Sequence, residues 1–154
     1  MFDFMKQYYP VFIEGTAQTI IISIIGILIG ILLGLIFVMM RLSKFKPFEY
    51  LARVYIAIVR GTPSMIQVML IYYTLSKAIS VPQIQFLGSG LDRMIPGSIA
   101  LGINSGAYTA EIFRSGIISI SKGQTEAGLS LGLSEKTTMF SIILPQAVRN
   151  ILPA

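Results

Sequence analysis

Long stretches without charged side chains dominate the hydrophobic pattern of this chain. The first of them, residues 15–40, contains no charged residue at all. A helix needs about 20 mostly apolar residues to cross the hydrocarbon core of a bilayer. Further apolar stretches at about 50–76 and 94–118 also reach that length. The pattern therefore predicts an all-α, multi-pass membrane protein with three transmembrane helices.

Small side chains recur along two of these spans at three- and four-residue steps, which places them on one face of a helix. Helices approach one another closely in lipid through such faces, because no hydrophobic force drives their association there. We therefore expect packing faces on the first and third spans. The residues are Thr16, Thr19, Ser23, Gly26, Gly30 and Gly34 in the first span, and Gly102, Gly106 and Ala110 in the third.

The second span is interrupted by the sequence Arg60-Gly61-Thr62-Pro63. Thr62 as a helix cap and Pro63 at the first helical position predict a fresh helix start inside the span. A broken helix in a transporter leaves backbone groups that face a cavity and can contact a solute. The alternative is an ordinary helix boundary near the membrane surface, and the sequence leaves both interpretations open.

Polar side chains lie on the face of the third span that is nearly opposite its small residues. Because an unpaired carboxylate that faces lipid is costly, we expect this face to line a cavity or to meet a partner. A competing role for Glu111 is an ion pair with Arg114, three residues further along the helix. Together with Thr62, the candidate residues of a substrate path are Asn104, Tyr108, Glu111 and Ser115.

Basic residues are concentrated at the span ends that the positive-inside rule assigns to the cytoplasm. With three spans, this distribution places the N-terminus outside and residues 121–145 inside. The basic residues assigned to the cytoplasmic side are Arg41, Lys44, Lys46, Arg53, Arg114, Lys122, Lys136 and Arg149.

The composition argues against most other classes of protein. Hydrophobic residues make up 54% of the chain and charged residues 12%, and the mean hydropathy is +0.76. The net charge of +5 is distributed over the span ends, so nucleic acid is not an expected partner. The chain has no cysteine or histidine to act as a nucleophile, a base or a zinc ligand. We expect a single domain, residues 1–154, that is not an enzyme and binds no metal.

Residues 121–145 are polar enough to leave the membrane, and their local signals predict two short helices. Ser121 and Gln124 have the spacing of a capping box, which starts a helix just after Ser121. Gly132 stands where a residue in the left-handed conformation ends that helix. Ser134 can cap a second helix, with Glu135 in its first turn. The predicted unit is two helices joined by a glycine turn. We expect this unit to move as a rigid lever when a partner pushes on it.

This loop resembles the EAA motif of ABC-importer permeases, the segment that docks into the ATPase. The family pattern is Glu-Ala-Ala, three residues, Gly, nine residues and then Ile-x-Leu-Pro. One position departs from it, because Gly128 stands where the second Ala is usual; this change would loosen the helix by roughly 1 kcal/mol. The positions in register are Glu126, Ala127, Gly132, Ile142, Leu144 and Pro145.

Two further segments, Arg60–Pro63 and Asn104–Arg114, resemble motifs of permeases for polar amino acids, a group that handles histidine, glutamate, glutamine, arginine and opines. The three motifs occur in the family order, so the resemblance covers nearly the whole chain. It implies the membrane-spanning permease subunit of an ATP-driven importer in the bacterial plasma membrane, with the 121–145 loop carrying a coupling helix. The implied ATPase-coupling residues are Glu126, Ala127, Gly128, Leu129, Leu131 and Gly132.

The same resemblance implies the partners. ATP and Mg²⁺ would bind to separate cytoplasmic ATP-binding subunits, so that this chain itself would hold no cofactor. A second permease subunit, identical or homologous, and an extracellular substrate-binding protein would complete the importer. Family members usually have five spans, so we expect a chain truncated at its C-terminus that does not transport alone. The alternative function is a truncated, non-transporting membrane scaffold that binds a cytoplasmic partner through residues 121–145.

Overall fold

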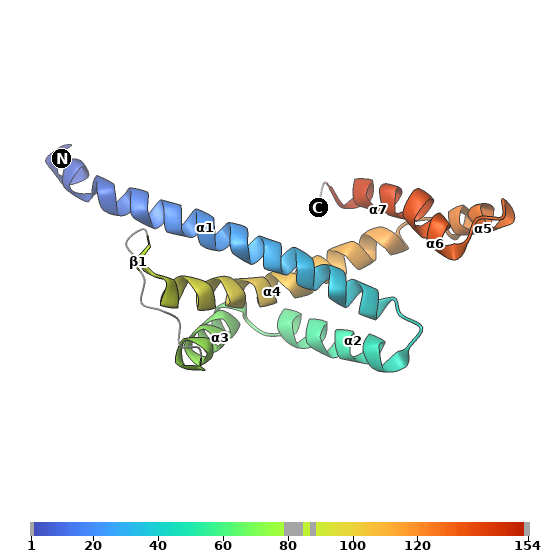
Figure 1. Ribbon diagram of the computed structural model, residues 1–154, viewed down its shortest axis with the longest axis horizontal. Coiled ribbons are helices and arrows are strands. Elements are labelled where there is room, and N and C mark those ends of the chain that lie inside the picture. Colours follow the sequence, from blue (N-terminus) through green and yellow to red (C-terminus); the bar gives the residue numbers. More distant parts are fainter. Residues whose placement is uncertain (1, 79–84, 87–88, 153–154) are drawn as a thin grey trace.

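The fold is a set of helices, in agreement with the all-α prediction (Figure 1). The computed structural model describes residues 2–78, 85–86 and 89–152. Within these residues the only strands are the two-residue segments β1 (Gln85–Phe86) and β2 (Ser89–Gly90), which pair antiparallel. The helices are α1 (Phe2–Arg41), α2 (Lys46–Gly61), α3 (Ser64–Ala78), α4 (Leu91–Ile118), α5 (Lys122–Ser130), α6 (Glu135–Thr138) and α7 (Leu144–Ile151), with a π-helical turn η1 (Met139–Ile143) between the last two.

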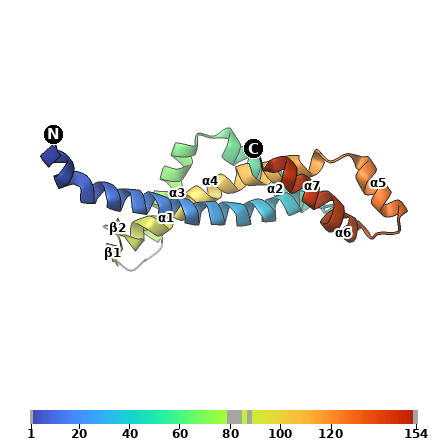
Figure 2. The same cartoon turned by 90° about the horizontal axis from the view of Figure 1, so that it is seen from above.

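The long helices α1 and α4 pack against each other in parallel, and Figures 1 and 2 show them side by side. Each glycine of the α1 packing face lies against a side chain of α4. A Cβ atom added at these glycines would come within 2.6–2.8 Å of the facing side chain, so the contact requires glycine. The facing pairs are Gly26 with Leu101, Gly30 with Ser105, and Gly34 with Thr109.

The packing face predicted on α4 also lies in this contact. A Cβ on Gly102 would lie 2.4 Å from Ile29 Cγ2, and one on Gly106 would lie 2.8 Å from Leu33 Cβ. Ala110 is completely buried. The periodicity of small residues therefore located both sides of the α1–α4 interface.

The outer end of the predicted α1 face does not take part in this packing. Thr16 and Thr19 are exposed, and their hydroxyls donate to the carbonyls of Phe12 and Gly15, at 2.7 and 2.8 Å. The prediction was wrong for these two residues. The reason is that α4 begins only at Leu91, which lies further along α1, beside Ile21 and Ile25.

The second predicted span is divided into α2 and α3, which meet at an angle of 109°. The break falls at Thr62 and Pro63, where the sequence predicted a fresh helix start. The predicted cap is wrong, however: the Thr62 hydroxyl donates backward to the Ile58 carbonyl at 2.8 Å, at the end of α2. Carbonyls at a helix end lack partners within the helix, and this bond satisfies one of them. We call this bend the α2–α3 elbow.

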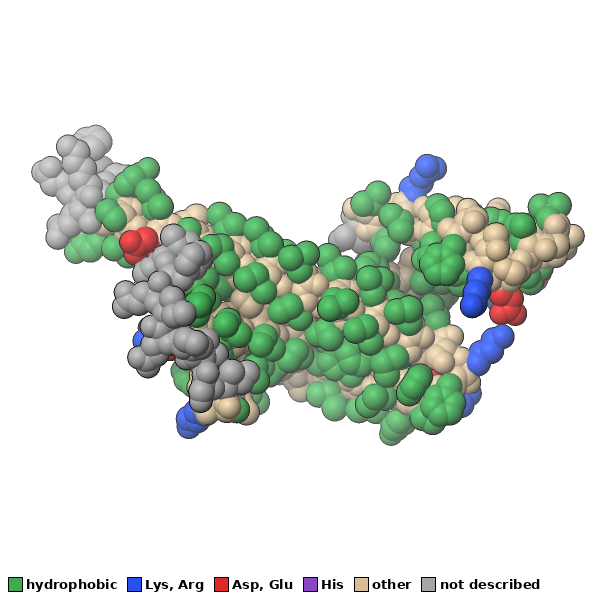
Figure 3. All heavy atoms as spheres, in the orientation of Figure 1, with side chains coloured by type: hydrophobic (Ala, Val, Ile, Leu, Met, Phe, Trp, Pro, Cys, Tyr) green, Lys and Arg blue, Asp and Glu red, His purple; other side chains and the backbone are tan. Residues whose placement is uncertain are grey.

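The surface of the molecule has the character expected next to lipid. Figure 3 shows hydrophobic side chains across its middle and charged side chains toward its ends. Leu28 and Leu32 of α1, for example, are 62% and 60% exposed. Judged by length and composition, the described part of the chain holds one helix apolar enough to cross a membrane, Tyr8–Arg41, and a second span if the pair α2–α3 counts as one. The third predicted span, α4, does not qualify by this criterion: its 28 residues are long enough, but its polar residues lower its hydropathy.

Candidate functional site

The loop that the sequence predicted as a lever has its two helices at the predicted positions. α5 begins directly after Ser121, whose hydroxyl oxygen accepts a hydrogen bond from the Gly123 amide at 3.3 Å. α6 begins directly after Ser134, whose hydroxyl oxygen accepts from the Thr137 amide at 3.1 Å. Both serines act as N-caps because they satisfy an amide that has no partner within its helix. Both cap positions agree with the sequence, but the predicted capping box of Ser121 and Gln124 is not formed, because the Gln124 Oε1 atom accepts from Gln146 Nε2 at 3.4 Å instead.

A glycine turn joins the two helices. Gly132 has φ of +80°, in the left-handed region that L-residues with a side chain rarely adopt. Its amide donates to the Leu129 carbonyl at 2.9 Å, and the Leu133 amide donates to the Gly128 carbonyl at 3.1 Å. These two bonds close the end of α5 in the manner of a Schellman motif. The predicted role of Gly132 as the helix stop is confirmed.

Gly132→Val is expected to open this turn. A β-branched residue at positive φ is an outlier, and the left-handed conformation costs an L-residue about 1–2 kcal/mol. Amide hydrogen exchange at Leu133 should therefore accelerate by about 5- to 30-fold. Gly132→Asn is the matched control, since asparagine tolerates this conformation. Unchanged exchange in the valine variant would contradict the assigned turn.

The departure from the family pattern at Gly128 has a tertiary consequence. Gly128 is buried, and a Cβ at this position would lie 2.7 Å from Thr138 Cγ2 and 3.2 Å from Ile142 Cδ1. The sequence predicted only that glycine loosens α5. In the structure, glycine also lets α5 lie close against α6 and η1, so the loop folds back on itself.

The other predicted coupling residues form an exposed surface on the loop, which we call the coupling surface. Glu126 and Ala127 are exposed, and Leu129 and Leu131 are 43% and 80% exposed. Glu126 forms no ion pair with the residues that the structure describes. A carboxylate beside exposed leucines can contribute both a charged and an apolar contact to a partner.

The loop is fastened to the end of α4. Gly116 of α4 lies against α7, where an added Cβ would be 3.2 Å from the Ala147 carbonyl oxygen and 3.1 Å from Ile151 Cγ2. Asn150 Nδ2 donates to Ser119 Oγ at 2.9 Å, at the C-cap of α4. A force applied to the coupling surface would therefore reach α4 through α7.

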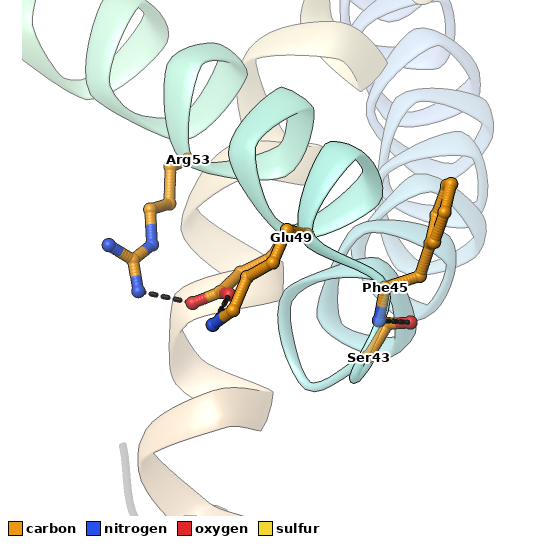
Figure 4. Close-up of polar contacts among 5 residues, drawn as sticks. Ser43, Phe45, Glu49 and Arg53 are labelled. Atoms are coloured by element: carbon orange, nitrogen blue, oxygen red, sulfur yellow. Dashed lines mark hydrogen bonds and ion pairs between the residues drawn. The ribbon is translucent and has the colours of Figure 1, made fainter.

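A second link joins the loop to the turn between α1 and α2. Lys44 Nζ lies 3.7 Å from Glu135 Oε2, but both side chains are largely exposed. Close to this turn, Lys46 Nζ lies 3.0 Å from Glu49 Oε2. Figure 4 shows the Glu49 carboxylate pointing toward Arg53. An exposed ion pair contributes about 0–1 kcal/mol, so the Lys44–Glu135 link is weaker than the packing of α7 on α4.

The second candidate site is the polar face of α4 beside the α2–α3 elbow. Asn104 is buried, and its Nδ2 donates to Gln67 Oε1 at 2.8 Å. Gln67 Nε2 in turn donates to the carbonyls of Val59 and Thr62, at 2.6 and 2.9 Å, and contacts Thr62 Oγ1. Two of the predicted path residues, Thr62 and Asn104, are thus brought together through Gln67. Sequence reasoning missed Gln67; the available signal was a polar residue among the apolar side chains of the first turns of α3.

The remaining path residues are arranged differently. Tyr108 is 42% exposed, and the guanidinium carbon of Arg60 lies 5.5 Å from the centre of its ring, in cation–π geometry. Glu111 pairs with Arg114, whose Nε donates to Glu111 Oε1 at 2.8 Å. The competing role that the sequence left open for Glu111 is therefore present. Ser115 donates to the Ile112 carbonyl at 2.8 Å within its own helix.

A hollow on the surface of α3 is not lined by the predicted path residues. Its lining comes from α3 itself and includes Ile66, Met69, Leu70 and Tyr73. The polar groups that could meet a solute lie instead at the elbow and on α4. We therefore place the candidate path there and not in the α3 hollow.

Comparisons with known proteins agree on one family. Residues 26–154 match the family model described as "Binding-protein-dependent transport system inner membrane component". Over 145 residues the chain is 39% identical to the arginine transport system permease protein ArtQ of Bacillus subtilis (strain 168), covering 94% of this chain and 63% of that one. Over 144 residues it is 40% identical to the glutamine transport system permease protein GlnP of Escherichia coli (strain K12), with the same coverage of 94% and 63%.

Two further matches extend the comparison: a relative whose name gives a different cargo, and a solved structure. The chain is 37% identical over 152 residues to the L-cystine transport system permease protein TcyB of Bacillus subtilis (strain 168), covering 98% of this chain and 61% of that one. It also matches a structure described as "Crystal structure of an amino acid ABC transporter with histidines", with a TM-score of 0.82 and 39% identity, over 99% of this chain and 67% of that chain. The chain spans 61–63% of the length of the three relatives named here.

Proposed function

Because this chain belongs to the family of binding-protein-dependent transport system inner membrane components, we propose that it serves in the permease subunit of an ATP-driven importer for a polar amino acid. The family description, an inner membrane component of a transport system, supports a location in the plasma membrane and a role in transport rather than in enzymatic catalysis. The relatives support an amino acid as cargo, since their names refer to arginine, glutamine and cystine. The likeness to a solved amino acid ABC transporter over 99% of the chain supports the same class.

The observation that carries the mechanism is the coupling surface on a loop attached to α4. In the proposed cycle, cytoplasmic ATP-binding subunits bind ATP and Mg²⁺ and move against Glu126, Leu129 and Leu131. The loop is internally packed through Gly128, so it transmits this movement as one piece. α7 passes the movement to α4 through Gly116 and Asn150. In this proposal, the movement that follows ATP binding rearranges the spans between outward and inward openings.

The path for the amino acid is proposed to run along the elbow and the polar face of α4. The elbow resembles the broken helices of transporters, which place backbone groups at a solute site. Arg60 and Tyr108 offer a cation and an aromatic face there, and Thr62, Asn104, Glu111 and Ser115 supply further polar groups. A second permease subunit and an extracellular substrate-binding protein complete the proposed importer, with the N-terminus of this chain outside.

Uptake into proteoliposomes tests this function. The permease would be reconstituted together with its ATP-binding subunits and its substrate-binding protein. We expect accumulation of one of several labelled amino acids (arginine, glutamine, cystine and histidine as a starting set) that requires ATP. A complex that assembles and hydrolyses ATP without moving any amino acid would reject the transport function and favour the scaffold.

A further inference from the structure

The α2–α3 elbow creates a hydrogen-bonding problem that one side chain solves. The last carbonyls of a helix have no partners within that helix, and inside a bilayer no water is available to replace them. Gln67 Nε2 donates to two such carbonyls at the end of α2, Val59 at 2.6 Å and Thr62 at 2.9 Å. Gln67 itself belongs to α3, so its amide group holds the two arms of the elbow together.

The same amide group reaches a third element. Gln67 Oε1 accepts a hydrogen bond from Asn104 Nδ2 of α4 at 2.8 Å, and Asn104 is only 9% exposed. A second polar link lies one residue away, where the Tyr55 hydroxyl of α2 donates to the Ile103 carbonyl at 2.5 Å. Breaking the Gln67–Asn104 bond would leave the buried Asn104 amide group unpaired, which costs about 1–3 kcal/mol.

We propose that Gln67 is a positioning residue that joins the α2–α3 elbow to α4, so that these elements move as one body during transport. The proposal rests on the proposed function, because it assigns Gln67 a role in the movement that starts at the coupling surface. α4 receives the movement at its Gly116 end, and Gln67 carries it to the elbow. Arg60 of the elbow and Tyr108 of α4 then keep their mutual arrangement while both are displaced.

Substitutions at Gln67 separate this role from binding of the amino acid. Gln67→Glu keeps the size of the side chain but removes both donor hydrogens, so a carboxylate faces the carbonyls of Val59 and Thr62. We expect the maximal uptake rate to fall at least about fivefold, the effect of unpaired buried polar groups, with the KM for the amino acid unchanged. Thr74→Val, at an exposed position of the same helix, is the matched control and should transport like the wild type.

Cross-linking tests whether the contact between the α2–α3 elbow and α4 persists throughout the transport cycle. The chain contains no cysteine, so the pair Tyr55→Cys and Ile103→Cys can be linked selectively by a bifunctional thiol reagent of matching length; this pair joins α2 to α4 beside the joint and leaves Gln67 and Asn104 in place. Because the joined elements move together, we expect uptake to be kept or to rise when the pair is linked. Uptake that falls on linking, and recovers when the link is cleaved, would overturn the proposal, since the contact would then have to open in each cycle.

Wild-type protein in the same proteoliposomes distinguishes the two levels of failure. No ATP-dependent uptake by a correctly assembled wild type would reject the proposed function. If the wild type transports and Gln67→Glu keeps the same maximal rate, the role of Gln67 in joining the elbow to α4 is rejected, but the proposed function is not. If Gln67→Glu does not assemble, the cross-linking result on the cysteine pair decides the question.

Discussion

Replacing Glu126 by alanine is expected to abolish ATP-driven uptake and to leave membrane insertion intact. Glu126 lies exposed on α5 and has no ion pair with the described residues, so the change removes no contact of that kind from this chain. In the proposed complex, the ATPase groove would shield this carboxylate from water. Truncating one member of such a buried charge pair costs about 2–5 kcal/mol, which lowers the affinity by roughly 30-fold or more.

Co-purification of the permease with its ATPase in detergent measures this effect directly, and uptake in proteoliposomes measures its consequence. Glu135→Ala is the matched control, because Glu135 is also an exposed carboxylate of the same loop. Its partner is Lys44, at 3.7 Å, and the Glu135 side chain is 79% exposed. Such an exposed pair contributes at most about 1 kcal/mol, so Glu135→Ala should bind and transport like the wild type. Wild-type binding by Glu126→Ala would remove Glu126 from the docking contact.

Gly102→Leu is expected to prevent correct packing of α1 against α4. The first atom of any side chain at this position would lie 2.4 Å from Ile29 Cγ2 and 3.3 Å from the Gly26 carbonyl oxygen. Because the backbone of α1 also lies close to this position, a larger side chain has no free volume to occupy, and the two helices must separate. Overpacking of this kind typically costs about 1–3 kcal/mol, and more where the backbone has to shift.

Gly97→Leu provides the comparison on the same helix, since a Cβ at Gly97 has no described atom within 4 Å. Both substitutions replace glycine in a helix and gain about 0.8–1 kcal/mol in propensity, so their difference reports the packing alone. Thermal unfolding in detergent, followed by size-exclusion chromatography, should show a lower midpoint and less monodisperse protein for Gly102→Leu only. Equal midpoints for the two variants would contradict the close contact of α1 and α4.

Several parts of this protein could be predicted from its sequence because their cause lies within a few residues. The caps Ser121 and Ser134 and the stop at Gly132 depend on hydrogen bonds that reach at most five residues along the chain. The break of the second span follows from Pro63, which has no amide hydrogen to donate and ends the helix locally. The α1–α4 interface could be located because helical periodicity places small residues on one face.

Other parts could not be read from the sequence, and two of them depend on residues further away in the chain. Nothing near Gln67 indicates that it would bond to Asn104, 37 positions later. At Thr62 the sequence predicted an N-cap of α3, but its hydroxyl donates instead to the Ile58 carbonyl at the end of α2. The close approach at Gly128 depends on Thr138 folding back over the glycine turn.

The sequence by itself determined the class of this protein: its apolar stretches, its small-residue faces and its two-helix loop all follow from local patterns and helix periodicity. The tertiary structure alone decided the 109° angle of the elbow, the Gln67–Asn104 joint and the attachment of the loop to α4 through Gly116 and Asn150. The physical reason is that a local pattern specifies which face of a helix will be buried. The partner of that face is set only when distant segments compete for the same buried volume and the same unpaired carbonyls.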